Sequence, residues 1–520
     1  MRPKATTTMA VGRLLKNAAI RFRDKEALCC VTTGRRFSFL ELNERANRLA
    51  NGLMSLGLKK GDMVAFLITN RAEIVDTYFA IGKTGVVGLP LNYRLIGKEI
   101  VQMMAMTGAK VLIFEDAFAK VAELVREQLP EVKTFIGIGK GIPDFALDYD
   151  KFIADASPDE PKVEITEEDD YYMNLTSGTT GLPKSYMLTH YNNAGGILDA
   201  TMMFKVTEDD SVLVVFPMFG RVGYVWMAAA IYNGARHVIM NFEPRKALEI
   251  IGTEKITITN WVPPMATFVL SVPDFDKFDL SSLRAVVFAG AAFPTPLQKQ
   301  VRKRITPNIY EFYGLQETAI IVNASTKDKA KNPASIGKVS PWAELRIVDA
   351  FGNDVPVGTT GEIIAKAMGG TTQYFKNEKQ TAETFKNGWC HTGDLGYLDK
   401  EGYVYISGRV KDMIVTGGQN VFSAEVENIL IAHPAVADCA VIGLPDEKWG
   451  EAVTAVIIKK AGSEVTSEEV IAFCRKEMAG FKVPKNIIWH EGQLPRTPTG
   501  KVQKYILVDM YSKQDVPARK

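Results

Sequence analysis

The sequence is poor in the residues that build disulfide frameworks and metal centres. Its five cysteines, at positions 29, 30, 390, 439 and 474, are odd in number and lack metal-ligand spacing, and the first two are adjacent. Its five histidines have no ligand spacing either, and no Gly-x-Ser-x-Gly segment is present. These absences disfavour zinc and serine-hydrolase chemistry and predict a reduced, cytoplasmic protein.

Long apolar runs and an excess of one charge are also missing. The run 225–232 is among the longest, well short of the roughly 18 residues of a membrane-spanning helix. The 62 basic and 60 acidic residues leave a net charge of +2, so no nucleic-acid partner is expected. Residues 1–23 hold six basic residues and no acidic one, as in a transit peptide, but apolar residues at helical spacing from Val11 to Phe22 favour a structural first helix.

A length of 520 residues predicts more than one domain. From residue 27 to about 330, short β-rich runs such as 63–68 and 110–114 alternate with helical stretches, which is typical of doubly wound α/β sheets. Shorter strands between Gly and Asp turns follow, as in a small barrel, at 344–348, 361–365 and 402–406.

A compact α+β segment comes after this barrel region. We therefore predict an α/β fold in which residues 1–410 form the large N-terminal domain, with doubly wound sheets and a small barrel. Residues 411–520 form a small, mobile α+β C-terminal domain.

The segment 176–184, Thr-Ser-Gly-Thr-Thr-Gly-Leu-Pro-Lys, has the composition of a phosphate-binding loop. Gly178 and Gly181 allow the backbone to approach a ligand and to turn its N–H groups toward an anion. Lys184 adds a point charge, and hydroxyl donors come from Thr176, Ser177, Thr179 and Thr180. A kinase or GTPase P-loop does not fit, because Pro183 lacks the N–H that a glycine would supply there.

This segment resembles the signature Ser/Thr-Ser/Thr-Gly-Thr-Thr-Gly-x-Pro-Lys of the adenylate-forming superfamily, which includes acyl-CoA synthetases, amino-acid adenylation domains and beetle luciferases. Further motifs in the matching order extend the resemblance over essentially the whole chain, at 311–318, 391–409 and 494–501. Within the superfamily the chain looks most like an AMP-forming acyl-CoA synthetase. The resemblance implies ATP, Mg²⁺ and CoA as ligands and Thr176, Lys184, Glu317 and Lys501 as catalytic residues.

The segment 311–318, Glu-Phe-Tyr-Gly-Leu-Gln-Glu-Thr, matches the superfamily's adenine and magnesium motif. An aromatic pair beside a glycine, Phe312 and Tyr313 beside Gly314, can stack a purine. Glu317 and Thr318 can hold Mg²⁺ and a phosphate oxygen. Alone, Tyr-Gly-x-x-Glu is more often a strand-to-helix junction, but its place after the phosphate loop favours the functional interpretation. The predicted nucleotide site also includes Gly290, Ala291, Ala292 and Glu311.

Asp394 lies in a Thr-Gly turn, where a carboxylate is well suited to accept two hydrogen bonds from a ribose diol. With Arg409 it resembles the family's ribose-binding pair. We interpret His391 beside it as a packing or turn histidine, because nothing pairs with it in the sequence.

The loop 494–501 contains two prolines and a glycine, which fix a turning segment that presents Lys501. A solvated lysine is the commoner outcome, but the resemblance implies that Lys501 meets the substrate carboxylate and the α-phosphate. Lys411 matches the family's hinge position, and Gly417, Gly418 and Gln419 lie on the face that CoA passes. A basic patch nearby could meet the nucleotide end of CoA, although a solvated helix end explains the same residues nearly as well. The patch consists of Arg475, Lys476, Lys482 and Lys485.

The acyl pocket departs from the family pattern. The family usually has Pro-x-Phe-His, whereas here 216–220 ends in Gly220, which leaves extra room. The wall residues predicted beside Gly220 are Val222, Tyr224, Trp261, Val262, Ala291 and Ile320. Such an apolar wall suits a medium-chain, branched or aromatic acid better than acetate.

The predicted reaction is ATP-dependent activation of a carboxylic acid to acyl-AMP, followed by transfer to CoA, as in fatty-acid metabolism. One alternative is a stand-alone adenylating enzyme that loads a carrier protein; an amino-acid substrate is disfavoured because 216–226 contains no acidic residue. A nucleotide-binding regulator without chemistry is disfavoured by the joint presence of Glu317, Asp394, Arg409 and Lys501. A homodimer remains compatible with the sequence.

Overall fold

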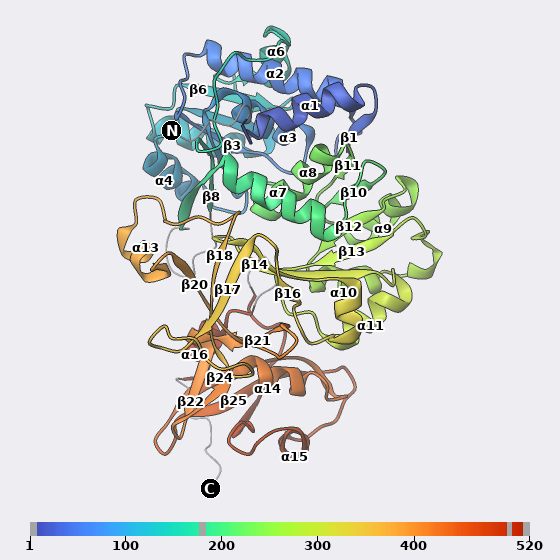
Figure 1. Cartoon of the computed structure of the whole chain (residues 1–520), viewed down its shortest axis with the longest axis vertical. Coiled ribbons are helices and arrows are strands. Elements are labelled where there is room, and N and C mark those ends of the chain that lie inside the picture. Colours follow the sequence, from blue (N-terminus) through green and yellow to red (C-terminus); the bar gives the residue numbers. More distant parts are fainter. Residues whose placement is uncertain (1–7, 176–183, 497–501, 513–520) are drawn as a thin grey trace.

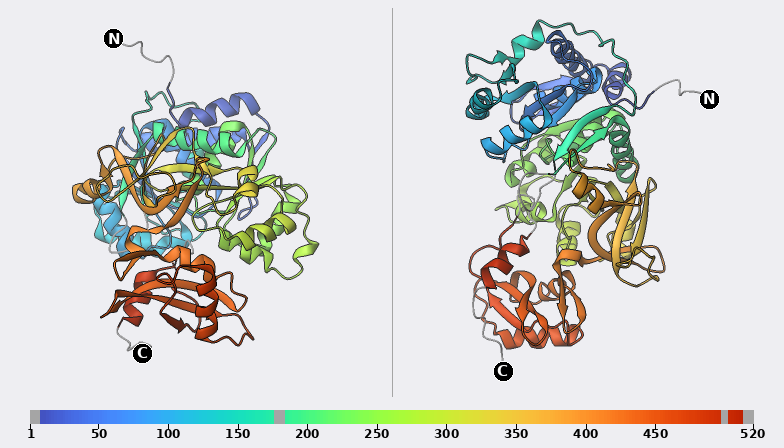
Figure 2. Two further views of the ribbon diagram at one scale, coloured as in Figure 1. Left: turned by 60° about the horizontal axis from the view of Figure 1, so that its bottom comes forward. Right: turned by 90° about the vertical axis from the view of Figure 1, so that its left-hand side faces the viewer.

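The computed structural model describes residues 8–175, 184–496 and 502–512. Two large sheets and a smaller one make up most of the molecule, and a C-terminal α/β unit lies at one end (Figures 1 and 2). The predicted site residues at 176–181 and Lys501 lie outside the described residues.

The first large sheet has seven strands in the order β7-β6-β5-β3-β4-β8-β9 and is parallel except for the hairpin β8–β9. The runs predicted as buried strands form β3 and β5, which are buried throughout, as expected for a sheet covered on both faces. The bounds are β3 Met63–Leu67, β4 Val87–Pro90, β5 Val111–Glu115, β6 Thr134–Ile138, β7 Leu147–Asp148, β8 Asp170–Leu175 and β9 Ser185–Thr189.

The second large sheet has nine strands in the order β16-β15-β14-β13-β12-β10-β11-β1-β2. Its central strands are parallel, and the antiparallel pairs lie at its two ends. The bounds are β1 Glu26–Cys30, β2 Arg36–Ser38, β10 Ser211–Val214, β11 Arg236–Ile239, β12 Ile258–Trp261, β13 Ala285–Phe288, β14 Ile309–Leu315, β15 Ala319–Ala324 and β16 Lys338–Val339.

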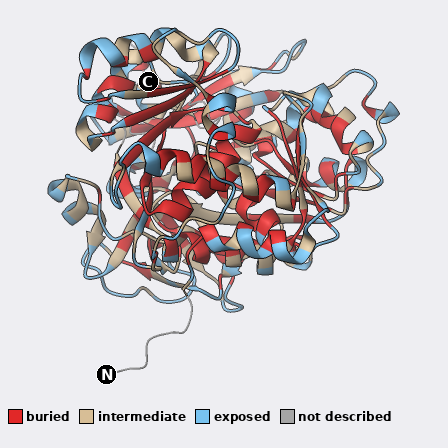
Figure 3. Ribbon diagram, turned by 90° about the horizontal axis from the view of Figure 1, so that it is seen from above, coloured by how far each residue is buried: buried red, intermediate tan, exposed pale blue. Residues whose placement is uncertain are grey.

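Helices pack on and between these sheets, and the predicted first helix is confirmed as α1 Gly12–Phe22. Figure 3 shows that the buried residues concentrate in the strands and in the helices between the sheets. The N-terminal helices are α1, α2 Phe39–Ser55, α3 Ala72–Thr84, α4 Gly97–Thr107, α5 Ala119–Gln128, α6 Tyr149–Ala154, α7 His190–Phe204, α8 Arg221–Asn233, α9 Pro244–Thr253, α10 Pro263–Leu270, α11 Thr295–Arg304, α12 Thr326–Lys331 and α13 Glu378–Thr384.

The main core joins the two large sheets through α3 and α8. Every residue of α3 is buried, so this helix has no solvent face. The rings of Tyr78 on α3, Tyr172 on β8 and Tyr224 on α8 lie within 4.7–5.6 Å of one another, centroid to centroid. Aromatic packing therefore fixes how the two sheets meet.

The region predicted as a small barrel is a curled antiparallel sheet of five strands. Among the described residues β17 and β21 do not pair, so the sheet stays open. Its strands are β17 Ala343–Val348, β18 Gly361–Ala367, β19 Phe385–Lys386, β20 Trp389–Leu398 and β21 Val404–Arg409.

The C-terminal unit has its own five-stranded sheet and hydrophobic core. The boundary predicted between 410 and 411 falls inside the short 3₁₀ helix Val410–Asp412, which joins β21 to β22. The elements of the C-terminal unit are β22 Met413–Thr416, β23 Gln419–Phe422, α14 Ser423–Leu430, β24 Val436–Asp446, β25 Gly450–Lys459, α15 Ser467–Glu477, β26 Asn486–Trp489 and α16 Lys504–Tyr511. Within the described ranges of the whole chain, no helix has the length and apolarity needed to cross a bilayer.

Candidate active site

Some of the predicted nucleotide residues lie at the carboxyl ends of neighbouring parallel strands in the nine-stranded sheet: residues 290–292 follow β13, and Glu317 follows β14. β12, β13 and β14 lie side by side and run the same way, so the segments that follow them meet at one edge. Gly290 follows β13 with a positive φ of 81°, and a Cβ added to it would lie 3.4 Å from the Val262 side chain after β12. Open α/β sheets bind ligands at this edge.

The β14–β15 turn, residues 315–319, carries Glu317 and is unusually tight. A Cβ on Gly314 would lie 1.7 Å from the Ala319 carbonyl oxygen, so only glycine fits there. Ala319 itself has a φ of +61°, which a non-glycine residue rarely adopts. The Thr318 hydroxyl accepts the Leu315 N–H at 3.1 Å and closes the turn. Strain of this kind is tolerated where surrounding contacts determine the conformation.

Three side chains from elsewhere in the fold hold Gln316 in that turn. The Asn174 amide on β8 donates to Gln316 Oε1 at 2.7 Å, and the Tyr186 hydroxyl on β9 donates to the Gln316 carbonyl. Arg221, the first residue of α8, donates to the same carbonyl at 2.7 Å. Because β8 and β9 flank the segment 176–183, the strands of the predicted phosphate loop are bonded to the turn that carries Glu317.

Glu317 and Lys184 meet at one tyrosine. The Tyr374 hydroxyl donates to Glu317 Oε1 at 2.7 Å, and Lys184 Nζ lies 4.9 Å from the centre of the same ring. Burial, and then the neighbouring Glu317 carboxylate, raises the pKa of Tyr374 well above its usual value, so its hydroxyl keeps its proton. The predicted metal ligand and the predicted phosphate-loop lysine are thus brought together.

The predicted ribose pair is also adjacent in space. Arg409 Nε donates to Asp394 Oδ1 at 2.7 Å, and the two residues pair across β20 and β21. The Tyr313 hydroxyl donates to Asp394 Oδ2 at 2.7 Å. The backbone N–H of Asp394 donates to the Thr392 hydroxyl at 3.0 Å, which fixes the turn. Asp394 therefore connects the curled sheet to β14.

Three residues of the adenine motif lie differently from the expectation. Phe312 and Tyr313 are consecutive in β14, so they point to opposite faces of the sheet and do not form one stacking pair. Phe312 packs against Phe204 at 5.7 Å, whereas Tyr313 reaches Asp394. The Glu311 carboxylate is buried and pairs with Lys329 on α12 at 2.5 Å, so this side chain serves the fold.

The predicted acyl wall divides between the carboxyl edge and the core. Val222 and Tyr224 are two residues apart on α8, so they lie on different faces of the helix. Val222 is partly buried, while Tyr224 lies among the core tyrosines and Trp261 packs with Phe288 in a second core cluster. Ile320 on β15 is also buried in the main core.

Gly220 caps the N-terminus of α8, and an added Cβ would have an ordinary contact at 3.4 Å, so there is room for a side chain.

In the C-terminal unit, the turn with Gly417 and Gly418 joins β22 to β23, and both glycines have a positive φ. A Cβ on Gly417 would lie 2.8 Å from the Trp449 ring, over which Lys485 Nζ lies at 4.2 Å. Gln419 and Lys411 are exposed. Lys482, a predicted CoA contact, pairs with Glu425 at 2.6 Å.

Sequence reasoning missed the residues that tie these motifs together, because their contacts join distant segments. Asn174, Tyr186, Arg221 and Tyr374 belong to no motif, and no local pattern singles them out. His391 does have a partner: its Nδ1 lies 2.8 Å from Glu362 Oε2 on the neighbouring strand β18, in keeping with a structural role.

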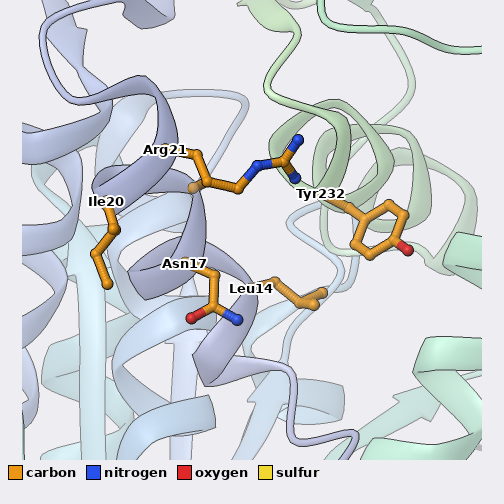
Figure 4. Close-up of a pocket in the computed structure, with 6 residues that line it drawn as sticks. Leu14, Asn17, Ile20, Arg21 and Tyr232 are labelled. Atoms are coloured by element: carbon orange, nitrogen blue, oxygen red, sulfur yellow. The ribbon is translucent and has the colours of Figure 1, made fainter.

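Other candidate sites carry less chemistry. Glu26, Cys29 and Glu254 have the spacing of a metal site, but Arg36 and Arg236 form ion pairs with both carboxylates. A surface pocket between α1 and the end of α8 is lined by none of the predicted site residues (Figure 4); its walls are Leu14, Asn17, Ala18, Ile20, Arg21 and Tyr232.

Comparison with known proteins agrees with the arrangement of these motifs. The sequence model described as "AMP-binding enzyme" matches residues 15–375, and that of the "AMP-binding enzyme C-terminal domain" matches residues 425–501. The chain is 34% identical to a feruloyl-CoA synthase of Amycolatopsis sp, over 91% of this chain and 93% of the relative. It is 32% identical to a long-chain-fatty-acid–CoA ligase of Mycobacterium tuberculosis, over 96% and 98% of the two chains.

Among solved structures, the fold is similar to that of an anthranilate CoA ligase in complex with anthranoyl-AMP. The TM-score is 0.88 at 29% identity, over 96% of this chain and 97% of that one. The predicted α/β fold with a large N-terminal and a small C-terminal part is confirmed by this likeness. The chain therefore belongs to the AMP-binding enzyme family, within the adenylate-forming superfamily, and the prediction of an AMP-forming acid–thiol ligase is confirmed at the level of that class.

Proposed function

We propose that the chain activates an aromatic or medium-to-long apolar carboxylic acid with ATP and transfers the acyl group to CoA. The observation that carries this proposal is that Glu317 and Lys184 both contact Tyr374, the first through its hydroxyl and the second over its ring. This happens at the edge where the strands flanking the phosphate loop bond to the β14–β15 turn. Asp394 and Arg409 supply a second polar group on the curled sheet, which the Tyr313 hydroxyl links to β14. Together they fit the phosphates and the ribose of one nucleotide.

In the first half-reaction the acid's carboxylate oxygen attacks the α-phosphorus of ATP. A P–O bond forms, the bond to the β-phosphate oxygen breaks, and pyrophosphate leaves with the bonding electrons. Lys184 and the hydroxyl and N–H groups of 176–181 neutralise charge that moves onto the leaving group. Lys501, from the C-terminal domain, contacts the carboxylate and the α-phosphate. Asp394 accepts hydrogen bonds from the ribose hydroxyls.

Glu317 is the residue proposed to hold Mg²⁺. Its carboxylate is a hard oxygen donor, and among the described residues it forms no ion pair. Thr318 lies beside it but uses its hydroxyl within the turn, so we assign it the phosphate side of the site. What the cation supplies when bound is positive charge against the phosphate oxygens.

In the second half-reaction the CoA thiol attacks the acyl carbonyl. The C–S bond forms, the thiol proton leaves to solvent, and AMP departs with the C–O electrons. We propose that rotation at Lys411 brings the Gly417–Gly418 turn to the site, where the two glycines allow a thin thioalkyl chain to pass. Trp449 and Lys485, beside this turn, are suited to the nucleotide end of CoA, whereas Lys482 must first leave Glu425.

The class of acid is argued from the pocket and from the relatives. Val222, Val262 and Ala291 offer no charge, and Gly220 leaves volume at the start of α8. The similar proteins are named for ferulate, long-chain fatty acids and anthranilate, which are all larger than acetate. An apolar acid of aromatic or medium-to-long chain type fits these observations.

The test is acid-dependent ATP–pyrophosphate exchange over a panel from acetate to laurate, with benzoate, coumarate, ferulate and several amino acids, with and without CoA. We expect exchange with one aromatic or medium-to-long acid, and AMP release that rises steeply when CoA is added. Exchange that CoA leaves unchanged would instead favour a carrier-protein acceptor.

The pocket is tested by Gly220→His, which adds a side chain where the backbone leaves room. The preferred acid is expected to become smaller, with kcat/KM for the best large acid falling about tenfold and that for a short acid kept within about threefold. An equal loss for all acids would contradict the assignment of Gly220 to the pocket.

A further inference from the structure

Tyr374 lies in the connection between β18 and α13, outside every motif that the sequence singles out. Its backbone N–H donates to the Thr381 hydroxyl at 2.9 Å, and the next residue, Phe375, donates to the Ser185 carbonyl at 2.7 Å. Ser185 directly follows Lys184 and begins β9. The ring is buried and packs against Phe385 at 5.6 Å. Tyr374 is therefore fixed in place beside the strand that leaves the predicted phosphate loop.

The same connection holds Glu317 at two points. The Tyr374 hydroxyl donates to Glu317 Oε1 at 2.7 Å, and the Thr371 N–H donates to the Glu317 carbonyl at 2.8 Å. Among the described residues, Glu317 Oε2 accepts no hydrogen bond. In the part of the chain that the structure describes, one oxygen is thus occupied and oriented, and the other is available to a ligand.

The face of the ring holds the second charge. Lys184 Nζ lies 4.9 Å from the ring centre, within the range in which an ammonium is attracted to an aromatic face. The hydroxyl of Tyr374 thus holds the negative charge of Glu317, and the face of its ring holds the positive charge of Lys184. The two charges come from different sheets, because Lys184 precedes β9 and Glu317 lies between β14 and β15.

We propose that Tyr374 is a positioning residue for the magnesium–nucleotide complex, which orients the Glu317 carboxylate for the cation and keeps Lys184 beside it. The inference rests on the proposed function, in which Glu317 and Lys184 contact MgATP. Carboxylates that bind metals are commonly held by a hydrogen bond on their other oxygen, and removing that bond typically lowers metal affinity 10–100-fold. Preorganisation also avoids ordering a mobile side chain at the moment of binding.

The test compares Tyr374→Phe with a matched control, Tyr403→Phe. Tyr403 is also buried, and its hydroxyl donates to a carboxylate, Asp328 Oδ1, at 2.9 Å, but it lies outside the proposed site. ATP binding is measured by calorimetry in EDTA and over a series of Mg²⁺ concentrations. For Tyr374→Phe we expect the Mg²⁺ concentration at half-maximal enhancement to rise about tenfold, while ATP affinity in EDTA stays within about twofold of wild type. Tyr403→Phe should leave both quantities unchanged.

A double-mutant cycle with Glu317→Gln separates positioning from folding. If Tyr374 acts through Glu317, adding Tyr374→Phe to Glu317→Gln should cause no further loss of Mg²⁺ dependence. A further tenfold loss would overturn the proposal. Should Tyr374→Phe not fold, Thr381→Val takes its place, because it removes the hydroxyl that accepts the Tyr374 N–H and leaves Glu317 unchanged. A loss of Mg²⁺ dependence in the same direction is expected, and an unchanged dependence would overturn the proposal.

The outcomes also distinguish this inference from the proposed function. Wild-type protein that binds ATP equally well in Mg²⁺ and in EDTA would remove the basis of both. Magnesium-dependent binding by wild type that Tyr374→Phe leaves unchanged would overturn the role of Tyr374 alone. Equal weakening with and without Mg²⁺ would show a general structural effect, and it would overturn the proposal as well.

Discussion

At the scale of single residues, Asp199 has an unusual environment. It lies on α7, is 1% exposed, and neither of its carboxylate oxygens has a hydrogen-bond partner among the described residues. Burial raises the pKa of this carboxyl from 3.8 to about 7, and the charge of Arg221 only partly opposes that effect. The folded state therefore holds a proton that the unfolded chain releases near pH 4.

This shift predicts a pH-dependent gain in stability from Asp199→Asn. Because the folded pKa is raised, wild type loses stability as pH rises from about 4 to about 7, by at most roughly 4 kcal/mol. The asparagine variant lacks that loss. We expect its melting temperature to exceed that of wild type at pH 8 by more than it does at pH 5, as measured by thermal unfolding at both values.

Asp210→Asn is a matched control of opposite sign. Asp210 is also buried, and although burial acts to raise its pKa, hydrogen bonds from Arg284 and Thr257 outweigh that effect and lower it. Its contribution is present above pH 4 and disappears in acid, so Asp210→Asn should destabilise the protein at pH 8 and do so less as pH falls toward 3. Parallel behaviour of the two variants would contradict this electrostatic account.

At the scale of elements, the β14–β15 turn links the site to the fold. Gly314 leaves no space for a Cβ, Ala319 holds a left-handed backbone, and Gln316 is bonded to β8, β9 and α8. The turn thus keeps Glu317 at a fixed position relative to two sheets. Its conformation depends on contacts made far from it in sequence.

We expect Gly314→Ala to be more damaging than its small size suggests. The new methyl would meet the Ala319 carbonyl oxygen, a backbone atom that cannot rotate away, so the turn must shift. The expected cost is about 1–3 kcal/mol of folding free energy, together with a loss of at least tenfold in Mg²⁺-dependent ATP binding, read by denaturant unfolding and calorimetry.

Gly480→Ala is the control for that change. Nothing lies within 4 Å of a Cβ added there, and its backbone needs no positive φ, so stability and nucleotide binding should stay at wild-type values. Wild-type nucleotide binding by Gly314→Ala would mean that the turn geometry does not matter for the site.

Elements also show how far the sequence could be read. Apolar runs such as 63–68 predicted buried strands correctly, because burial on both faces leaves a continuous pattern. Motif order predicted that Asp394 and Arg409 meet. Phe312 and Tyr313 face opposite sides of the sheet because side chains alternate along β14. Glu311 is buried because Lys329, on the later helix α12, pairs with it. Tyr374 could not be found, because its contacts join segments with no shared local pattern.

At the scale of the whole molecule, a single short connection joins the two parts of the chain. β21 ends at Arg409, which is bonded to Asp394, and β22 begins at Met413. Between them the 3₁₀ helix Val410–Asp412 contains the exposed Lys411. We propose that a rotation there moves the C-terminal sheet as a body, and the separate core of that sheet supports this proposal.

Two variants assayed on separate half-reactions test this rotation. Lys501→Ala should lose acyl-adenylate formation yet still convert added acyl-adenylate and CoA to thioester. Lys411→Pro should keep acid-dependent pyrophosphate exchange and lose thioester formation at least tenfold, because proline fixes φ near −65° and also restricts Val410 before it. Lys411→Ala, which removes the charge but leaves the backbone mobile, should retain more thioester formation than the proline variant. If Lys501→Ala and Lys411→Pro lose the same half-reaction, the two reactions do not use different domain orientations, and Lys411 is not the hinge.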